Sequence, residues 1–513
     1  MQQTRKLITR LSPITWVILL GALVKFAVQM INAPGYGLFM DEMYTLALSR
    51  HLAFGYVDLP PLVPALMALT RILLGTSLPA MHLVPALAGA ATLVFVCLIA
   101  REFGGRTFAV GVSALGFIVV PIWLTFNSAF CYDCIDQLIL AGFLYTLVRF
   151  LKSGNRNLWI VMGGLAGLAC LTKMTILFLG PGFLVALLIS KYRKDLLTPW
   201  PWLGAGLCLV IVSPYLIWEI ANHWPTLEYW QTYGTFRLFK ASLPQYFMNI
   251  MAFMNPWLLP LYLAGLYRLF RRLNGVNYGF LGVLFLVTLA LLFYLHASLR
   301  MLCVVFMPLI AAGGVFTEEV LSGARWRLGL RTVPAAYLLA AGLFVMPTVL
   351  PILPIESVYN LPRSVKFWYQ SVREMNGGNS YAPITLVGRV GWEPVARDVA
   401  AVYNQLPAEE RATAGIFTDW YYTAAALDYY GPRYGLPPSV SGSLNYYLWG
   451  PGDYSWDEML IVTTRVNIYD VFFDACEQKA IVRTDAIGAY RIFVCKGAKL
   501  SPQAIWPHTK NYH

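Results

Sequence analysis

The feature that most constrains this chain is a series of long apolar segments that begins near residue 13 and ends near residue 350. A helix needs about 20 mainly apolar residues to cross the hydrocarbon core of a bilayer, and many of these segments are long enough. Only 12% of the 513 residues are charged, whereas a soluble domain has about 25%. This composition excludes a soluble globular fold for most of the chain and predicts a polytopic α-helical membrane protein.

Eleven segments are predicted to cross the membrane, although Gly and Pro interrupt several of them. The first has no small-residue cleavage site and is predicted to be a retained helix rather than a cleaved signal peptide. The predicted crossings are residues 13–32, 82–100, 107–126, 135–151, 158–172, 174–190, 202–221, 256–270, 278–296, 299–316 and 333–350.

The basic residues orient these crossings, because Lys and Arg concentrate on the cytoplasmic side of short loops. They precede the first crossing and follow every even-numbered one, at Arg5, Lys6, Arg10, Arg101, Arg106, Lys152, Arg156, Lys191, Arg193, Lys194, Arg268, Arg271, Arg272, Arg325, Arg327 and Arg331. This pattern predicts a cytoplasmic N-terminus, with the loops 33–81, 127–134 and 222–255 outside. The net charge of +12 is then mostly a topology signal, and no nucleic-acid motif or partner is predicted.

The composition changes at about residue 351, where "PILPIESVYNLP" leaves the membrane. The remaining residues are predicted to form a small extracytoplasmic α/β domain. Its predicted helices are 393–405, 419–430 and 468–477, and its predicted strands lie in "AGIFT", "MLIVTT", "AIVRT" and "YRIFVC". The predicted domains are therefore residues 1–350, which span the membrane, and residues 351–513, which lie outside it.

Four cysteines lie in segments predicted outside or near the outer face. Cys476 and Cys495 flank two predicted neighbouring strands, so they form either a disulfide in an oxidising compartment or two buried thiols. Cys131 and Cys134, in "CYDC", would need further ligands to hold zinc, and none is evident in the sequence.

Three carboxylates lie in the first outside loop, in "MDEMYTLALSRHLAFGYVDLPP". Asp41 and Glu42 begin a segment that resembles an amphipathic helix on the membrane surface, so one interpretation is a solvated loop with a capped helix. Asp58 precedes Pro60 and Pro61, which suit the entry to a second short helix. The alternative is that two juxtamembrane helices carrying acids cover a cavity at the membrane surface.

Two more acids, Asp133 and Asp136, begin the fourth crossing from the outside, in "NSAFCYDCIDQLILAGF". Their spacing of three residues places them on one helix face. Acids at membrane depth are costly and usually face the protein interior or a wet cavity. A functional role is favoured over simple helix capping.

Cations are predicted at the same outer surface. Lys173 interrupts the apolar run "GLACLTKMTILFLGPG", where an unpaired ammonium group costs about 3 kcal/mol. It is therefore expected to snorkel, to pair with an Asp or to bind an anion, and Lys25 in the first crossing is expected to snorkel or pair. The outside loop 222–255 adds Glu228, Arg237 and Lys240 among residues that also fit an interfacial aromatic belt, and Arg300 begins the tenth crossing.

Acids and cations at one membrane surface suit the transfer of a sugar from a lipid-linked phosphate ester. One carboxylate takes the proton from the attacking hydroxyl or amine, and cations hold the departing phosphate. A transporter or flippase of sugar or lipid-linked sugar is the alternative, but its polar site would lie near the midplane at a repeat interface. A non-catalytic scaffold would leave the cation at Lys173 unexplained.

The segments "MDEMYTLALSRHL", "GYVDLPPL", "YDCID" and "LTKMTILFLGPG" resemble membrane glycosyltransferases of the GT-C fold, such as protein O-mannosyltransferases and the lipid A aminoarabinose transferase. Later segments such as "WPTLEY", "NPWLLPLYLAGL" and "SGSLNYYLWGP" are similar to bacterial family 39-like members. The resemblance implies a polyprenyl-phosphate sugar donor of the undecaprenyl type, inverting transfer to a lipid, glycan or protein acceptor, and a location in the bacterial inner membrane.

The resemblance also implies roles for individual residues. Asp41 matches the family's candidate base and Glu42 its acidic neighbour. Asp133 matches the usual second acid, whereas Asp136 lies where relatives of the looser group carry an acid instead, so the resemblance leaves the choice between these two open. Lys173 matches a lysine assigned to the donor phosphate, and Arg300 lies near a basic position of the family. Asp58 departs from the pattern, because the aminoarabinose transferases carry a lysine just before the proline of this loop. That departure argues against the aminoarabinose activity, and no cofactor beyond an optional divalent cation is expected.

Overall fold

The computed structural model describes residues 11–33, 35–237, 242–322, 327–360, 383–466, 469–484 and 488–512. The chain forms two compact units that do not follow the linear sequence. The helical unit comprises Met1–Gly35, Leu74–Ile217 and Phe239–Asn376, and the composite unit comprises Tyr36–Leu73, Trp218–Leu238 and Gly377–His513. The boundary at residue 350 stays a prediction, whereas the composite unit joins the first outside loop to the C-terminal segment.

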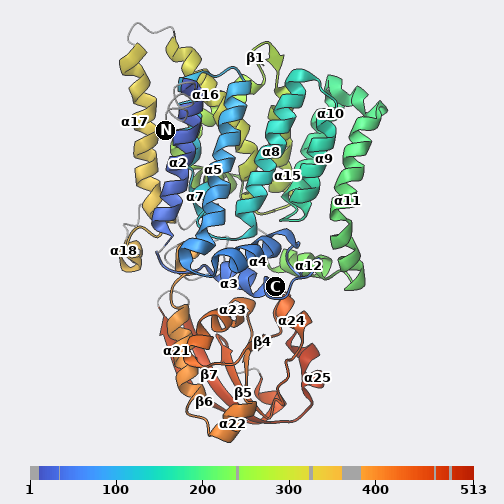
Figure 1. The fold of residues 1–513 in the computed structure, drawn as a ribbon, viewed down its shortest axis with the longest axis vertical. Coiled ribbons are helices and arrows are strands. Elements are labelled where there is room, and N and C mark those ends of the chain that lie inside the picture. The colour runs from blue at the N-terminus through green and yellow to red at the C-terminus, as the bar shows by residue number, and fades with distance from the viewer. Residues whose placement is uncertain are drawn as a thin grey trace, which may run out of the picture. The chain divides into compact units, whose positions relative to one another are not determined.

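The helical unit contains nearly all of the apolar segments (Figure 1). Its helices are α2 (Pro13–Asn32), α5 (Leu78–Glu102), α6 (Thr107–Ile118), α7 (Pro121–Phe126), α8 (Tyr132–Ser153), α9 (Leu158–Cys170), α10 (Thr175–Ile189), η1 (Lys191–Leu197), α11 (Pro199–Ala221), α13 (Leu243–Met254), η2 (Pro256–Leu258), α14 (Leu259–Leu269), α15 (Gly279–Tyr294), η3 (Leu299–Phe306), α16 (Met307–Ser322), α17 (Arg327–Val349) and α18 (Ile355–Tyr359). A short hairpin, β1 (Arg272–Leu273) with β2 (Val276–Asn277), lies between α14 and α15.

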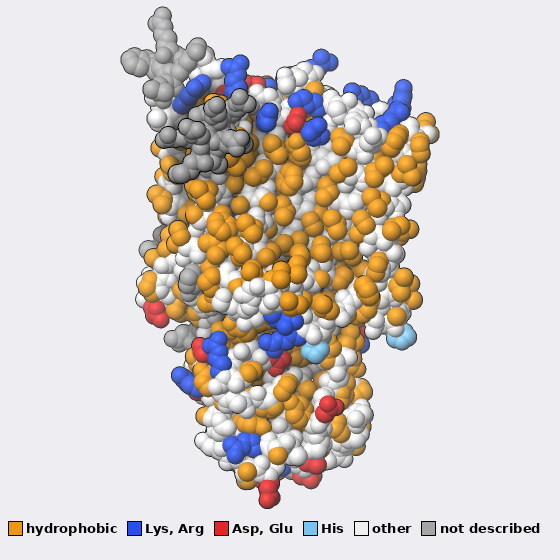
Figure 2. Space-filling view, in the orientation of Figure 1, with side chains coloured by type: hydrophobic (Ala, Val, Ile, Leu, Met, Phe, Trp, Pro, Cys, Tyr) orange, Lys and Arg blue, Asp and Glu red, His pale blue; other side chains and the backbone are white. Residues whose placement is uncertain are grey.

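Every one of the eleven predicted crossings lies on a helix or on consecutive helices of this unit. Among the described residues, six helices are long and apolar enough to cross a membrane. Two bent pairs, α10 with η1 and α13 with η2 and α14, pass the same test together but turn by 101° and 94° at their breaks. Figure 2 shows hydrophobic side chains over the visible face of this unit and Lys and Arg side chains gathered at one of its ends.

The basic loops at that end are linked to one another by ion pairs. Lys152 Nζ lies 2.7 Å from Glu102 Oε2, and Arg156 Nε lies 3.2 Å from Asp195 Oδ1. Arg268 pairs at 2.7 Å with Glu319 Oε1. These contacts bring together loops that the charge pattern assigns to the same side of the membrane.

Lys25 is fully buried in α2, and its role differs from the predicted snorkelling or acid pairing. Its Nζ donates a hydrogen bond of 3.0 Å to Trp123 O, and Gln29 Nε2 donates one of 3.1 Å to Leu124 O. Both carbonyls belong to the last turn of α7, where backbone oxygens have no partner within the helix. A cation is favourable at this negative end of a helix dipole, so Lys25 and Gln29 cap α7.

The composite unit contains a mixed sheet with helices around it (Figure 1). The strand order is β4-β3-β5-β7-β6, with parallel pairing among the first three strands and antiparallel pairing among the last three. Its elements are α3 (Met40–Leu48), α4 (Leu62–Leu74), α12 (Pro225–Arg237), α20 (Ile384–Val387), α21 (Trp392–Tyr403), α22 (Ala408–Thr413), β3 (Gly415–Thr418), α23 (Tyr421–Tyr430), η4 (Gly431–Tyr434), β4 (Ser439–Ser441), α24 (Asn445–Trp449), β5 (Glu458–Thr463), η5 (Asp470–Phe472), β6 (Phe473–Thr484), β7 (Gly488–Ala498), α25 (Pro502–Ile505) and η6 (Trp506–Thr509).

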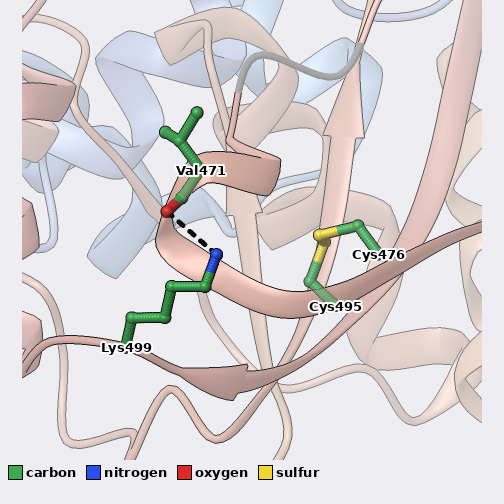
Figure 3. The surroundings of a disulfide bond; sticks show 4 residues. All are labelled: Val471, Cys476, Cys495 and Lys499. Atoms are coloured by element: carbon green, nitrogen blue, oxygen red, sulfur yellow. Dashed lines mark hydrogen bonds between the residues drawn. A yellow bond between two sulfur atoms is a disulfide. The ribbon is translucent and has the colours of Figure 1, made fainter.

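The prediction of a helix at 468–477 is wrong, whereas the other predicted helices and strands of this segment lie on α21, α23, β3, β5, β6 and β7. Residues from Phe473 onward form the edge strand β6, which pairs with β7 along its length. In this register Cys476 lies opposite Cys495, and the two form a disulfide (Figure 3). Beside it, Lys499 Nζ donates a hydrogen bond of 3.4 Å to Val471 O. Pairing with β7 thus decides the strand, where local composition favoured a helix.

Helix α3 is buried on most of its surface, so the interpretation of a solvated loop is wrong. Seven of its nine residues, Glu42 to Leu48, are buried, and it packs on α23. The Glu42 carboxylate accepts a hydrogen bond of 2.8 Å from Phe39 N and lies 3.6 Å from Arg389 Nη1. Both charged side chains are at most 2% exposed. This ion pair joins the first outside loop to the C-terminal segment.

Removing one partner of this pair should destabilise the composite unit strongly. Arg389→Met would leave the Glu42 carboxylate buried without its cation, which costs about 3–5 kcal/mol for comparable buried pairs. We expect a loss of this size in unfolding free energy, measured by urea titration of the purified chain in detergent with tryptophan fluorescence. The double variant Arg389→Met with Glu42→Gln should recover much of the loss.

Arg397→Met is the matched control, because Arg397 lies on α21 and pairs with Asp398 while 64% exposed. An exposed pair contributes at most about 1 kcal/mol, so this variant should unfold almost as the wild type does. Equal stability of the Arg389 and Arg397 variants would refute the role given to the buried pair.

Candidate functional site

Asp41 is a partly exposed residue in the first turn of a helix that is otherwise mostly buried. The backbone of Asp41 is held by Thr45, whose hydroxyl donates a hydrogen bond of 2.7 Å to Asp41 O. Its carboxylate accepts a hydrogen bond of 3.0 Å at Oδ1 from Tyr421 Oη. An acid in the first helical turn is stabilised by the helix dipole. The surroundings therefore orient this carboxylate and leave part of it accessible.

Asp58 lies in the same unit and accepts a hydrogen bond of 2.9 Å at Oδ1 from Tyr44 Oη. Asn445 supports this arrangement from the C-terminal segment, because its backbone N donates to Tyr44 Oη at 3.3 Å and its Oδ1 accepts from Val57 N at 3.2 Å. Burial raises the pKa of the Asp58 carboxyl from 3.8 to about 7. The bond from Tyr44 opposes this rise, and the charge of Asp41 adds to it. Near neutral pH Asp58 is thus divided between its protonated and ionised forms.

The helical unit has a separate cluster at the start of α8. Lys173 Nζ forms an ion pair and a hydrogen bond with Asp133 Oδ1, and Arg300 Nη1 lies 3.6 Å from Asp133 Oδ2. Lys173 is 14% exposed and Arg300 is 27% exposed. Two cations therefore share one carboxylate in a partly desolvated place, where their attraction for an anion is stronger than in water. Of the alternatives expected for Lys173, the structure shows pairing with an Asp, and Arg300 lies beside the same acid.

Asp136 lies one helical turn after Asp133, and its Oδ1 accepts a hydrogen bond of 2.9 Å from Thr172 Oγ1. Thr172 and Lys173 are presented to α8 by the turn between α9 and α10. Met174 ends this turn in the left-handed conformation, with a φ of 61°. A side chain in that conformation costs about 1–3 kcal/mol, so the surrounding structure must hold the turn.

The remaining predicted site residues belong to the outside loop. Glu228, on α12, pairs at 2.7 Å with Lys510 Nζ in an exposed ion pair of the composite unit. Arg237 is the last residue of α12, but its side chain lies outside the described residues, and so does Lys240. Among the described residues, no group of three or more His, Cys, Asp or Glu side chains could hold a metal ion.

Sequence reasoning did not single out the C-terminal residues that contact the first-loop acids or their partners. Tyr421 contacts Asp41 and Arg389 contacts Glu42, while Asn445 contacts Tyr44, the hydrogen-bond donor to Asp58. Asn445 lies in "SGSLNYYLWGP", a segment that the family resemblance includes, and Tyr421 lies in the predicted helix 419–430. Nothing in the spacing of either residue points to Asp41 or Tyr44. In the run "SGSLNYYLWGPGDYSW", Asn445 and Tyr446 are buried in the unit. Contacts across such a separation become visible only in the folded chain.

Comparisons of sequence relate the chain to glycosyltransferases. Residues 58–218 match the family model of dolichyl-phosphate-mannose-protein mannosyltransferases. The lipid A galacturonosyltransferase RgtD of Rhizobium johnstonii is 24% identical over 226 residues, which is 43% of this chain. The matched region spans 46% of the length of RgtD.

Comparisons of structure extend over almost the whole chain. ArnT from Cupriavidus metallidurans, solved with bound undecaprenyl phosphate, has a TM-score of 0.60 at 15% identity and covers 93% of this chain and 97% of its own. The oligosaccharyltransferase AglB from Archaeoglobus fulgidus, in complex with an inhibitory peptide and a dolichol-phosphate, has a TM-score of 0.51 at 11% identity, with 88% and 69% covered. The predicted GT-C-type fold, a polytopic helical domain with a C-terminal α/β domain, is confirmed, and the chain is a multi-pass membrane protein.

The raised pKa of Asp58 predicts how the stability of the composite unit depends on pH. The folded state keeps a proton on Asp58 up to about pH 7, whereas the unfolded chain releases it near pH 3.8. Stability from this group is therefore full below pH 3.8 and falls as pH rises to about 7. Asp58→Asn mimics the protonated form, so its unfolding free energy should fall less with pH than that of the wild type over this range.

The measurement is urea unfolding at a series of pH values, with the difference between the two curves as the readout. Asp453→Asn is the control, because Asp453 is an exposed carboxyl of the same unit. Its curve should follow the wild type. Parallel curves for the wild type and Asp58→Asn would contradict the buried, proton-holding environment.

Proposed function

We propose that the chain is an inverting glycosyltransferase that moves a sugar from a polyprenyl-phosphate donor of the undecaprenyl type to an acceptor at the extracytoplasmic face of the bacterial inner membrane. Asp41 acts as the general base, and Lys173 and Arg300 hold the donor phosphate. The N-terminus is cytoplasmic and the C-terminal segment is periplasmic in this proposal. The acceptor is a lipid, a glycan or a protein, and the lipid A named for RgtD is the first acceptor to test.

The observation that carries the proposal is the convergence of Lys173 and Arg300 on Asp133. Two cations thus meet one carboxylate at the start of an apolar helix, with a second acid, Asp136, one helical turn further along. A phosphate on a lipid tail has the charge and the location to use such a cluster. The bound undecaprenyl phosphate of ArnT, which shares the fold, gives the same ligand class independent support.

In the proposed reaction the acceptor oxygen or nitrogen attacks the anomeric carbon as the bond from that carbon to the phosphate oxygen breaks. Asp41 takes the proton that the acceptor loses, which is general-base catalysis. The polyprenyl phosphate departs with the electron pair of the broken bond. Attack opposite the leaving group inverts the anomeric centre, so one base is enough and no glycosyl-enzyme intermediate forms.

Lys173 and Arg300 stabilise the negative charge that grows on the phosphate as it leaves. Asp133 keeps the two cations together before the donor arrives, and Asp136 orders the turn that presents Lys173 through its bond with Thr172.

Glu42 has a positioning role through Arg389 and the first turn of α3. Asp58, with its pKa near 7, provides a polar group near Asp41 whose charge varies around neutral pH. Arg237, Lys240 and Glu228 remain candidates for substrate contact.

The direct test is mass spectrometry of the surface lipids and glycans of cells with and without the chain, followed by transfer assays with purified chain and undecaprenyl-phosphate sugars. A glycosylated product that requires the chain supports the proposal. Movement of lipid-linked sugar across proteoliposomes without any glycosylated product would favour the transporter alternative instead.

Asp41→Asn should abolish transfer while leaving the fold intact. The substitution keeps the size of the side chain and the ability to accept a bond from Tyr421, but an amide cannot take the acceptor proton. We expect turnover to fall by at least about 100-fold, as typical for loss of a general base. The control is Asp453→Asn, which should keep wild-type turnover, and near-normal transfer by Asp41→Asn would exclude Asp41 as the base.

Lys173→Gln and Arg300→Gln should weaken binding of undecaprenyl phosphate itself, without any sugar or acceptor. Loss of one charge-assisted contact should raise the dissociation constant roughly 10-fold, measured with the purified chain in nanodiscs. Asp133→Asn removes the carboxylate that competes for the same cations, so it should bind at least as tightly as the wild type. Lys191→Gln, an exposed lysine on η1, is the control. Unchanged affinity in both cation variants would remove these residues from the phosphate site.

A further inference from the structure

Two of the three carboxyls of the first outside loop share a structural feature that the proposed reaction does not itself require. Each accepts a hydrogen bond from a phenol hydroxyl, Asp41 from Tyr421 and Asp58 from Tyr44. Tyr44 lies in the same loop as its acid, but Tyr421 belongs to the C-terminal segment. The partner of the candidate base thus comes from a part of the chain that the predicted catalytic domain does not include.

We propose that Tyr421 is a positioning residue for Asp41, so that the C-terminal segment is a working part of the catalytic unit rather than only a cover or an acceptor-binding module. This inference rests on the proposed role of Asp41 as the base. It assigns to Tyr421 the orientation of the Asp41 carboxylate and the maintenance of its ionised form.

The position of the Tyr421 hydroxyl is fixed from two sides. Tyr421 is the first residue of α23, directly after Trp420, whose extended backbone begins the helix. Its ring packs on the ring of Tyr44, with centroids 4.6 Å apart and an interplanar angle of 56°. Because α3 packs on α23, the hydroxyl reaches Asp41 Oδ1 at 3.0 Å without a flexible loop between them.

Orientation matters because a carboxylate rotates easily about its last torsion, which has no sharp staggered minima. A bond to Oδ1 fixes the plane of the group and with it the direction of Oδ2. A base must meet the acceptor proton at hydrogen-bond distance in the reacting complex. A fixed plane therefore raises the fraction of encounters that are productive without adding any affinity for donor or acceptor.

The same bond favours the form of Asp41 that can accept a proton. A hydrogen bond donated to a carboxylate stabilises its charge, whereas a nearby negative charge does the opposite. Asp41 has both kinds of neighbour, since Asp58 is close enough for the charge of Asp41 to raise the Asp58 pKa. Tyr421 offsets that repulsion at Asp41.

Three other acids near α3 have partners other than Tyr421, namely Glu42 with Arg389, Asp58 with Tyr44 and Asp428 with Tyr446. The further titratable and charged groups of this region are Arg50, Tyr422, Tyr429 and Tyr430. Removing one hydroxyl from Tyr421 leaves these groups in place, so a change in Asp41 can be assigned to the lost bond.

Tyr421→Phe tests the inference, because it removes the hydroxyl and keeps the ring that packs on Tyr44. The full-length chain, purified in detergent and labelled with ¹³C at the aspartate carboxyls, reports the Asp41 titration through the signal that Asp41→Asn lacks. We expect the Asp41 titration to move upward by about one pH unit. With an undecaprenyl-phosphate sugar that the wild type uses, kcat should fall roughly 10-fold, with KM for the donor unchanged and the acidic limb of the pH profile moved in the same direction.

Tyr403→Phe is the matched control, because Tyr403 also donates a short hydrogen bond, of 2.7 Å to Arg411 O. Tyr403 is the last residue of α21, and no hydrogen bond joins it to Asp41 among the described residues. It should leave the Asp41 titration and kcat unchanged. If Tyr421→Phe behaves like this control while Asp41→Asn is inactive, the inference is overturned and the proposed function stands. If Asp41→Asn transfers sugar normally, both fail. A shifted titration with wild-type kcat would give Tyr421 a structural role only and would also overturn the inference.

Discussion

The buried ion pair between Glu42 and Arg389 is the contact on which the composite unit depends. Neither charge can be left without the other in a site that excludes water, because the cost of an uncompensated buried charge exceeds the gain from most single contacts. The pair fixes the start of α3 against the C-terminal segment, and the bond from Phe39 N to Glu42 fixes the first helical turn. The position of Asp41, one residue earlier, follows from these two constraints. An acidic neighbour that looks catalytic in the sequence is in this structure the anchor of the candidate base.

The two polar clusters are built in different ways. Lys173, Asp133 and Arg300 come from the ends of three apolar segments of the helical unit, and a single left-handed residue, Met174, turns Lys173 toward α8. These three residues come together because the segment ends that carry them are predicted to lie at the same membrane surface. Asp41 and Asp58 instead depend on packing between a loop and the distant C-terminal segment. The cluster of Lys173, Asp133 and Arg300 is suited to binding the phosphate of a charged lipid. The packing around Asp41 and Asp58 is suited to controlling the orientation and protonation of these two carboxyls.

Buried polar groups elsewhere in the helical unit show that an intramembrane charge need not indicate a substrate. Lys25 raised the same question in the sequence as Lys173 did. In the structure it caps the last turn of α7 together with Gln29, whereas Lys173 joins an acid and a second cation. The difference between a capping lysine and a candidate phosphate-binding lysine therefore lies in the partners.

The apolar segments and the basic loops determined the polytopic fold and the grouping of loop ends from the sequence alone, because hydrocarbon thickness and charge placement act locally along the chain. Asp133, Asp136 and Lys173 could be singled out for the same reason, since a charge in an apolar run stands out. Tertiary structure alone decided that the first residues of β6 form a strand rather than a helix, that α3 is buried, that Arg389 and Tyr421 contact Glu42 and Asp41, and that Asn445 supports Tyr44 beside Asp58. These outcomes depend on which distant segments pack together. That packing is determined by the free energy of the whole core, so no short segment predicts it.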